Sequence, residues 1–320
     1  MVQGLRYLSV ISAFLVLFAV AACELTDTGV SVEEIDLDHS LQELITGYGQ
    51  RPLSNFILPP SDDFLSIPQD PNNLLTAAKV ELGKLLFHET GLATHPARED
   101  GRGTYACATC HHAGAGFHSG RQQALADGAV AWGDNAMGRT PNPNYALSDV
   151  DTRPVRTPTV LNSAYQQVMM WDGRFGAVVP NIGTESQWNP EKDASENRLG
   201  YHGLESQAIA ALKGHRMDAI ELSDVVSNPL YLELWERAFP GQPIDREHVG
   251  LAIAAYERTI LANRAPFQQW LRGERDAMSA KEKRGAILFF GKAGCEDAVS
   301  YTHLTLPTIT SGCRSRWGAW

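Results

Sequence analysis

Cys107-Ala-Thr-Cys110-His111 is the stretch of sequence that decides the fold. In a Cys-x-x-Cys-His motif the two thiols stand one helical turn apart and add across the two vinyl groups of haem, while the adjacent histidine is placed to bind the iron axially. The motif predicts one covalent c-type haem, attached through Cys107 and Cys110, with His111 as the metal ligand. A bare Cys-x-x-Cys pair also occurs in redox dithiols and in half of a zinc site, but the sequence offers no second pair for zinc.

The composition is that of a globular protein. The chain has 320 residues, of which 43% are hydrophobic and 20% charged, and this length is sufficient for two domains with buried cores. The formal net charge of −10 argues against a nucleic-acid partner, because phosphate binding needs a basic face and the sequence has no Lys/Arg cluster. An acidic surface instead favours a basic protein partner.

The first 22 residues predict export. Arg6 leads into an apolar run from Tyr7 to Ala22, which is typical of a secretory signal peptide. Val20-Ala-Ala-Cys23 also resembles a bacterial lipobox, so residues 1–22 are expected to be a lipoprotein-type signal and Cys23 the lipid anchor. A plain signal peptide or an uncleaved anchor is the alternative. We therefore expect the protein in the periplasm or cell envelope, where c-type haem is attached.

Helical periodicity dominates the chain beyond an acidic tether expected over residues 23–65. No strand pattern competes with it, so the predicted fold class is all-α. A Gly/Asn/Pro-rich stretch up to about Arg153 is long enough to wrap a cofactor. Helices are expected over residues 74–87, 159–171, 203–213 and 229–239, the last of them capped by Asn228. A further helix is expected to begin at the cap residue Asp245 and to end at Pro266. The last expected helix begins at a capping box of Ser279 and Glu282 and ends at Gly291.

A series of motifs together resembles the bacterial dihaem cytochrome c peroxidase and MauG family. In chain order they are Leu82-Gly-Lys-Leu-Leu-Phe87, Ala106-Cys-Ala-Thr-Cys-His111 with Gly116-Phe117, Arg156-Thr-Pro-Thr-Val-Leu-Asn162, Trp171-Asp-Gly-Arg174, Ala255-Tyr-Glu-Arg-Thr259, Pro266-Phe267 and Gly285-Ala-Ile-Leu-Phe-Phe-Gly-Lys-Ala-Gly-Cys295. The match covers roughly residues 70–297. It implies two cytochrome c-like α-helical domains, with the peroxidatic domain expected at residues 66–240 and the start of the second at 241–297.

The resemblance also implies a reaction. In this family hydrogen peroxide is reduced to water at the N-terminal haem, and electrons from a small donor such as a cytochrome c or cupredoxin enter through the C-terminal haem. Trp171 is implied to be an electron relay between the haems; a buried core aromatic is the alternative. Three other functions stay open, namely a MauG-like oxidase of a partner protein, a plain c-type electron-transfer cytochrome and a structural lipoprotein without haem.

The resemblance assigns the distal side of the haem to the segment around residues 204–216. Gln207 corresponds to the family's distal-pocket glutamine, and Arg216 stands where the family has a catalytic glutamate. An arginine cannot act as a base, although it can polarise the departing oxygen of peroxide. Glu205 and His215 are therefore candidates for the proton transfer, and a solvent-facing helix position is the alternative for each.

Two further departures from the family concern metals. No histidine lies between His118 and His202, where many members have a displaceable iron ligand, so the iron bound by His111 is expected to be open. Arg156 stands where the family often has an asparagine that binds calcium, which makes a calcium site doubtful.

Cys295 is expected to be half of a second haem site. The family pattern requires Gly-Cys-x-x-Cys-His, but Cys295 is followed by Glu-Asp-Ala-Val. We expect residues 298–320 to be a non-native tail, because two stretches of it are in-frame translations of a transposase mosaic end and a sequencing-library adapter. The second domain is then truncated, and an external donor is expected to turn the chain over inefficiently. A genuine divergent tail, in which His303 and Cys313 are functional, is the alternative.

Overall fold

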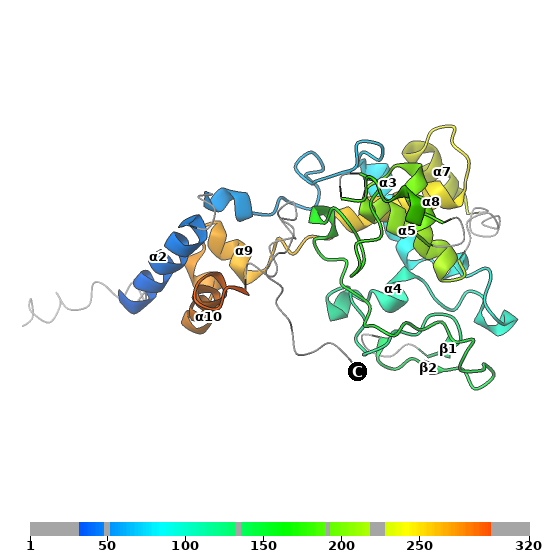
Figure 1. The fold of residues 1–320 in the computed structure, drawn as a ribbon, viewed down its shortest axis with the longest axis horizontal. Helices are drawn as coiled ribbons and strands as arrows, with labels where there is room; N and C mark the ends of the chain where they lie inside the picture. Colours follow the sequence, from blue (N-terminus) through cyan, green and yellow to red (C-terminus); the bar gives the residue numbers. More distant parts are fainter. Residues whose placement is uncertain are drawn as a thin grey trace, which may run out of the picture. The chain divides into compact units, whose positions relative to one another are not determined.

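The computed structural model describes residues 32–47, 52–131, 136–178, 180–189, 193–217 and 228–295 (Figure 1). These residues belong to two compact units, of which the larger spans Ile57–Gln268 and the smaller combines the chain up to Phe56 with Gln269–Glu296. The units divide the chain differently from the boundaries expected at residues 65 and 240. The lipid-anchor candidate Cys23 and the tail at 298–320 lie outside the described residues.

The larger unit is a packed set of helices. Its α-helices are α3 (Ala77–His88), α4 (Cys107–Cys110), α5 (Gly203–Gly214), α7 (Pro229–Ala238) and α8 (Arg246–Arg258). Helix α8 packs against both α3 and α5, and α3 also contacts α7 (Figure 1). Fully buried side chains such as Leu82, Phe87 and Val249 form the core, and each stabilises the fold by about 1.5–3 kcal/mol.

The crossing of α3 and α8 depends on Gly83. A Cβ atom at this position would lie 1.8 Å from the carbonyl oxygen of Ala252, so only glycine lets the two backbones approach this closely. The close crossing brings Phe87, at the end of α3, edge-on against the ring of Tyr256 with centroids 5.4 Å apart. The same Phe87 ring lies 6.3 Å from the imidazole of His111. The α3–α8 pair therefore packs against the Cys-x-x-Cys-His motif through Phe87.

Strands contribute little to the described structure. Strand β1 (Ala129–Val130) pairs antiparallel with β2 (Thr140–Pro141), with Val130 opposite Thr140. The connections carry 3-10 helices, which in the larger unit are η3 (Thr90–Leu92), η4 (Glu99–Gly101), η5 (Ala113–Ala115), η7 (Ser163–Tyr165), η8 (Glu185–Gln187) and η9 (Asp193–Leu199). The predicted all-α class is confirmed.

Helices with a strong local start signal form where the sequence predicts them. Asn228 caps α7 by accepting the N–H of Leu230, and Asp245 caps α8 by accepting the N–H of His248. Ser279 and Glu282 form the expected capping box of α10 (Ala280–Phe290). Helices α3 and α5 are also confirmed. None of the described helices has the length and apolar character required to cross a membrane.

The helix predicted over residues 159–171 is wrong. This segment contains only the one-turn η7, because Asn162 and Met170 have φ angles of 59° and 73°, which an α-helix does not allow. Asn162 instead bonds to the chain beyond α8. Its N–H donates to the carbonyl of Ile260 at 2.9 Å, and its Oδ1 accepts the N–H of Ala262 at 2.9 Å. Long-range hydrogen bonds have replaced the helical ones.

The smaller unit contains α2 (Val32–Gly47), η2 (Leu53–Phe56), η10 (Arg275–Ala277) and α10, and α9 (Pro266–Leu271) lies where the chain passes into it. Helix α2 lies within the segment expected to be a tether. Asp38 on α2 accepts a hydrogen bond from the indole of Trp270 at 2.6 Å and lies 2.9 Å from the ammonium group of Lys283. Because all three side chains are buried, this pairing satisfies charges that would otherwise destabilise the unit.

Candidate haem site

Cys107 and Cys110 stand at the two ends of the single-turn helix α4. Both are free, half-buried thiols that pack against the core of the larger unit. Burial raises the pKa of Cys107, to which the nearby carboxylate of Glu257 adds, and burial raises the pKa of Cys110 to about 12. Both thiols are therefore neutral, whereas reactive redox dithiols have lowered pKa values. The environment favours haem attachment over a redox pair.

His111 directly follows α4 and is held in one orientation. Its Nδ1 lies 3.2 Å from the carbonyl oxygen of Phe117. Because a carbonyl only accepts, this contact assigns the proton to Nδ1 and would leave the lone pair of Nε2 for a metal. Burial lowers the pKa of His111 to about 4, so the imidazole is in its neutral, ligating form. This is the geometry that an axial haem ligand requires.

The loop after His111 provides this carbonyl. Gly116 has φ = 70°, a conformation that glycine adopts readily, and the turn directs the Phe117 carbonyl back to His111. Arg156 then fixes the loop, since its Nε and Nη2 donate to the carbonyl of Ser119 at 3.1 and 2.9 Å. Arg156, the residue expected to make a calcium site doubtful, therefore holds the loop that orients His111.

Two buried polar atoms in this region have no hydrogen-bond partner among the described residues. They are Nε of Arg121 and Oε2 of Glu257. Buried polar groups in folded proteins are nearly always hydrogen-bonded, so this pair fits a site that takes a further polar group. The charge of Glu257 adds to the effect of burial in raising the pKa of Cys107. Together with two neutral thiols and an oriented imidazole, these atoms fit a c-type haem held by Cys107, Cys110 and His111.

Glu257 predicts a pH dependence of stability. Burial raises the pKa of this carboxyl from 4.5 to about 8, and the neighbouring charge of Glu205 adds to the shift. Native Glu257 therefore keeps its proton up to about pH 8 while the unfolded chain loses it, so the free energy of unfolding falls as the pH rises from about 5 to 8. A single proton contributes a slope of at most about 1.4 kcal/mol per pH unit.

The variant Glu257→Gln is expected to flatten this slope and to be more stable than wild type near pH 8. The measurement is chemical denaturation of the haem-loaded protein across this pH range. Glu233→Gln, at an exposed position on α7, is the control and should leave the slope unchanged. An identical slope in wild type and Glu257→Gln would show that Glu257 ionises freely.

Glu205 is fixed in a buried ion pair. Its side chain is fully buried, and its two carboxylate oxygens accept hydrogen bonds from Nε and Nη2 of Arg258 at 2.7 and 2.6 Å. Arg258 also donates to the carbonyl of Pro68 at 2.9 Å. Glu205 is thus neither a solvent-facing helix residue nor a carboxylate with a free oxygen. It joins α5 to α8 rather than presenting a base to a substrate.

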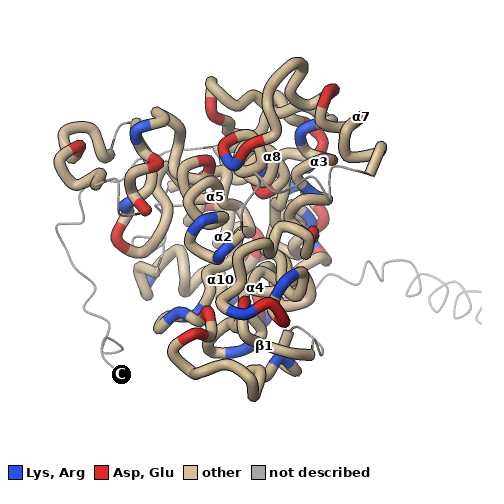
Figure 2. Tube along the Cα trace, turned by 90° about the vertical axis from the view of Figure 1, so that its right-hand side faces the viewer, with Lys and Arg blue, Asp and Glu red and all other residues tan. Residues whose placement is uncertain are grey.

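Arg216 and His215, just beyond α5, are each paired with a buried aspartate. Arg216 Nη1 donates to Oδ2 of Asp127 at 2.5 Å, and His215 Nδ1 lies 2.7 Å from Oδ2 of Asp151. Burial would lower the pKa of Arg216, but the hydrogen bond and charge of Asp127 raise it. Figure 2 shows acidic and basic segments in close succession in the loops near α4 and β1. Arg216 is a fixed positive charge, and His215 is the neighbouring titratable group.

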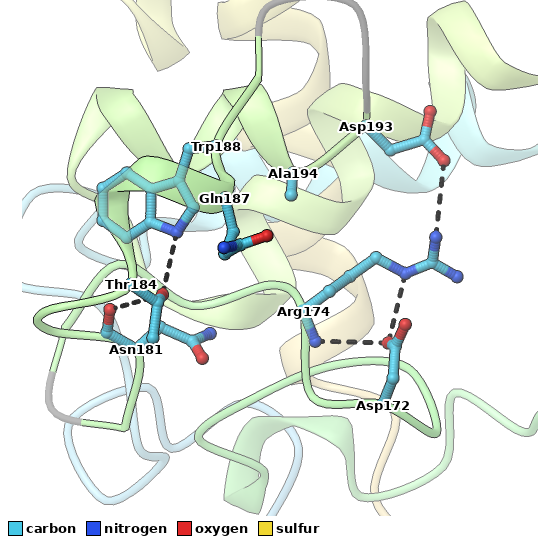
Figure 3. Close-up of a pocket in the computed structure, with 8 residues that line it drawn as sticks. All are labelled: Asp172, Arg174, Asn181, Thr184, Gln187, Trp188, Asp193 and Ala194. Carbon is cyan, nitrogen blue, oxygen red and sulfur yellow. Dashed lines mark hydrogen bonds and ion pairs between the residues drawn. The ribbon is translucent and has the colours of Figure 1, made fainter.

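Trp171, the candidate relay, is 102% exposed. The alternative of a buried core aromatic is wrong. Trp171 begins the turn that continues through Asp172 to Arg174. The guanidinium of Arg174 lies 3.2 Å from the carboxylate of Asp172 and 3.9 Å from that of Asp193 (Figure 3).

The polar insertion at residues 176–202 folds back onto this turn. Asn181 Nδ2 donates to the carbonyl of Gly173 at 2.8 Å. The fully buried Asn197 bonds to both the carbonyl of Arg174 and the N–H of Gly176. Insertion and turn together line a half-open pocket of about 360 Å³, whose polar residues include Thr184 and Gln187 (Figure 3). The insertion therefore braces the turn that presents Trp171.

The structure brings together only part of the predicted site. Cys107, Cys110 and His111 form one cluster, and His215 with Arg216 forms another. Gln207 is half-buried on α5, and Cys295, the candidate attachment point of a second haem, is an exposed free thiol. Sequence reasoning missed Asp127, Asp151, Glu257, Arg258 and the Phe117 carbonyl. Local patterns gave no signal for the two aspartates, although both lie in the irregular stretch expected to wrap a cofactor.

Comparisons with known proteins give matches over more than half of the chain. The sequence model of the family described as di-haem cytochrome c peroxidase matches residues 77–276. The methylamine utilization protein MauG of Methylorubrum extorquens is 32% identical over 231 residues, which are 72% of this chain and 51% of that protein. MauG of Methylophilus methylotrophus is 31% identical over 74% of this chain and 58% of that protein. Cytochrome c peroxidase Ccp of Escherichia coli is 29% identical over 68% of this chain and 37% of that protein. The chain thus spans about half the length of the curated relatives it matches.

Proposed function

Because this chain belongs to the di-haem cytochrome c peroxidase family, we propose that it is a haem-dependent peroxidase that reduces hydrogen peroxide to water with electrons from a small redox protein such as a cytochrome c. The observation that carries the proposal is the oriented, neutral His111 next to two neutral thiols. A single oriented axial histidine is typical of haem sites that bind a substrate on the opposite face.

Each residue of the site has a defined task. Cys107 and Cys110 hold the haem by thioether bonds, and His111 presents Nε2 to the iron while the Phe117 carbonyl fixes its tautomer and increases its basicity. When bound, the haem supplies the iron that binds peroxide and accepts electrons. Arg216, fixed by Asp127, provides a permanent positive charge that favours the developing negative charge on a departing oxygen.

Electrons enter through Trp171 in this proposal. Its indole is fully exposed, and the insertion holds its turn in place. The expected partner is a small cytochrome or cupredoxin, which delivers electrons through a second haem attached in part by Cys295 in the whole protein.

Replacing Trp171 with phenylalanine is expected to slow the delivery of electrons several-fold and to leave the haem spectrum unchanged. The change removes the indole from the proposed route, but it does not touch a residue that holds the haem. The measurement is the rate at which reduced cytochrome c re-reduces the peroxide-oxidised whole protein, which carries both haems. Trp188→Phe, at a buried tryptophan of the insertion, is the control. Equal rates for Trp171→Phe and wild type would discard the relay.

A MauG-like function is the second candidate. Two of the matching relatives, 32% and 31% identical to this chain, are named MauG, and the resemblance implies that Arg216 replaces a catalytic glutamate. In that case the oxidising equivalents go to side chains of a partner protein. Steady-state consumption of peroxide in the presence of reduced cytochrome c separates the two functions. In the whole protein with its second haem, sustained turnover supports the peroxidase, and no turnover supports the MauG-like oxidase or a plain electron-transfer cytochrome.

The proposed location is the periplasm or cell envelope. It follows from the signal-like residues 1–22 and from the lipobox-like Cys23, both outside the described part of the chain. Mass spectrometry of the mature N-terminus tests the anchor, because a free thiol at Cys23 would exclude it.

A further inference from the structure

His215 and Asp151 form a hydrogen-bonded pair at the end of α5 that the proposed function has not used. Cleaving the O–O bond of hydrogen peroxide requires a group that takes a proton from one oxygen and returns it to the other. Resting on the proposed peroxide chemistry, we propose that His215, oriented by Asp151, is the group that moves this proton.

The geometry gives His215 the form of a base. Its Nδ1 lies 2.7 Å from Oδ2 of Asp151, whose side chain is only 8% exposed. A carboxylate only accepts, so Nδ1 carries the hydrogen and Nε2 keeps a lone pair. Nε2 makes no hydrogen bond with the described residues, and the imidazole is 34% exposed, so a small molecule has access to it. A histidine held by an aspartate is the arrangement of acid–base catalysis in hydrolases.

The pair lies within electrostatic reach of the haem-attachment motif. Burial is the main cause that lowers the pKa of His111, and the charge of His215 contributes to the shift. Burial likewise dominates the raised pKa of Cys110, to which the charge of Asp151 adds. The hydroxyl of Tyr105, two residues before Cys107, donates to the carbonyl of Arg216 at 3.2 Å. The segment that carries His215 therefore adjoins the segment that carries the attachment motif.

The charged groups around His215 support this assignment. Arg153 donates to the carbonyl of Gly214 at 2.7 Å and lies 3.7 Å from Asp151. Burial would raise the pKa of Asp151, but its hydrogen bond to His215 and the charges of His215, Arg153 and Arg216 lower it. Asp151 thus stays ionised and keeps His215 in one tautomer. The remaining titratable neighbours are Asp127, bonded to Arg216, and Tyr105, whose hydroxyl donates to the Arg216 carbonyl at 3.2 Å.

The alternatives for the proton transfer are engaged elsewhere. Both oxygens of Glu205 are bonded to Arg258. Arg216 stays charged, because Asp127 and the carbonyl of Asp149 accept from its guanidinium. Among the described side chains near the end of α5, His215 alone combines a free ring nitrogen with an orienting carboxylate.

The transfer is balanced in protons and electrons. His215 Nε2 would take one proton from the first oxygen of hydrogen peroxide and give the same proton to the second oxygen as the O–O bond breaks, so the second oxygen leaves as water. The other oxygen leaves as a second water after two protons from solvent and two electrons from the small redox donor. His215 ends the cycle in the state in which it began.

The test compares haem-loaded wild type with His215→Gln and Asp151→Asn. The matched control is His248→Gln, because His248 makes a similar 2.8 Å contact with Asp245 at the start of α8. Hydrogen cyanide binds ferric haem as the anion, so its proton must be removed as it binds. We expect His215→Gln to slow the peroxide reaction by about 100- to 10,000-fold and to slow cyanide binding as well. Asp151→Asn should slow the peroxide reaction by about 10- to 100-fold. His248→Gln should react with peroxide and bind cyanide at the wild-type rates. The ferric spectrum should be the same in all four proteins.

The outcomes separate the failure of this inference from that of the proposed function. Wild-type rates of both reactions in His215→Gln would overturn the role of His215. A change from low-spin to high-spin iron in His215→Gln would also overturn it, because His215 would then be an iron ligand. If wild type binds cyanide but does not react with peroxide, the peroxidase proposal fails, and the cyanide rates of the variants still decide whether His215 moves protons at the site.

Discussion

The double variant Cys107→Ser/Cys110→Ser is expected to lose its covalent haem completely. Serine has nearly the same shape as cysteine but cannot form the thioether bonds to the vinyl groups. Both thiols face the core around α4 and belong to the same helical turn, so each single variant is expected to retain one bond and a weaker signal. The measurement is haem staining on a denaturing gel, where only covalently attached haem survives.

Cys295→Ser provides the control for this experiment. Cys295 is an exposed free thiol in the smaller unit, so its loss should leave the haem at Cys107 and Cys110 intact. A haem-stained band in the double variant, or its disappearance only in Cys295→Ser, would contradict the assignment of α4 as the attachment helix.

Glu205→Gln is expected to destabilise the larger unit by about 3–5 kcal/mol. The substitution leaves the Arg258 guanidinium, which is 1% exposed, without a compensating charge in the interior. It also breaks a two-point contact between α5 and α8, the two helices that carry much of the core. Chemical denaturation of the haem-loaded protein measures the loss.

Glu99→Gln is the matched control, because it removes the same charge from an exposed ion pair with Arg102. We expect a change of at most about 1 kcal/mol there. The double variant Glu205→Met/Arg258→Met should recover much of the lost stability, since it removes both buried charges. A loss below about 1 kcal/mol in Glu205→Gln would mean that water reaches the pair and that Glu205 is available for chemistry.

Helices with a local start signal could be predicted from the sequence. Asn228, Asp245 and Ser279 each cap a helix where the sequence places one, because an N-cap is a contact between residues two or three positions apart. The attachment motif is equally local. The segment 159–171 shows the limit, since its apolar residues suggested a helix while positive φ angles at Asn162 and Met170 and bonds to the end of α8 exclude one.

The surroundings of the haem site could not be predicted in the same way. Glu205 pairs with a residue 53 positions away, His215 with one 64 positions away and Arg216 with one 89 positions away. No local pattern encodes such contacts, because the fold of the irregular stretch before residue 153 creates them. The sequence therefore identified Glu205 and His215 as equal candidates for proton transfer, and only their partners distinguish them.

The reaction of the ferric, haem-loaded protein with one equivalent of hydrogen peroxide tests the central claim most directly. Rapid mixing with detection of the haem absorbance needs no electron donor and no second haem. We predict a fast change of the haem spectrum. An unchanged spectrum in protein whose haem is attached at Cys107 and Cys110 would contradict the claim that this site reacts with peroxide.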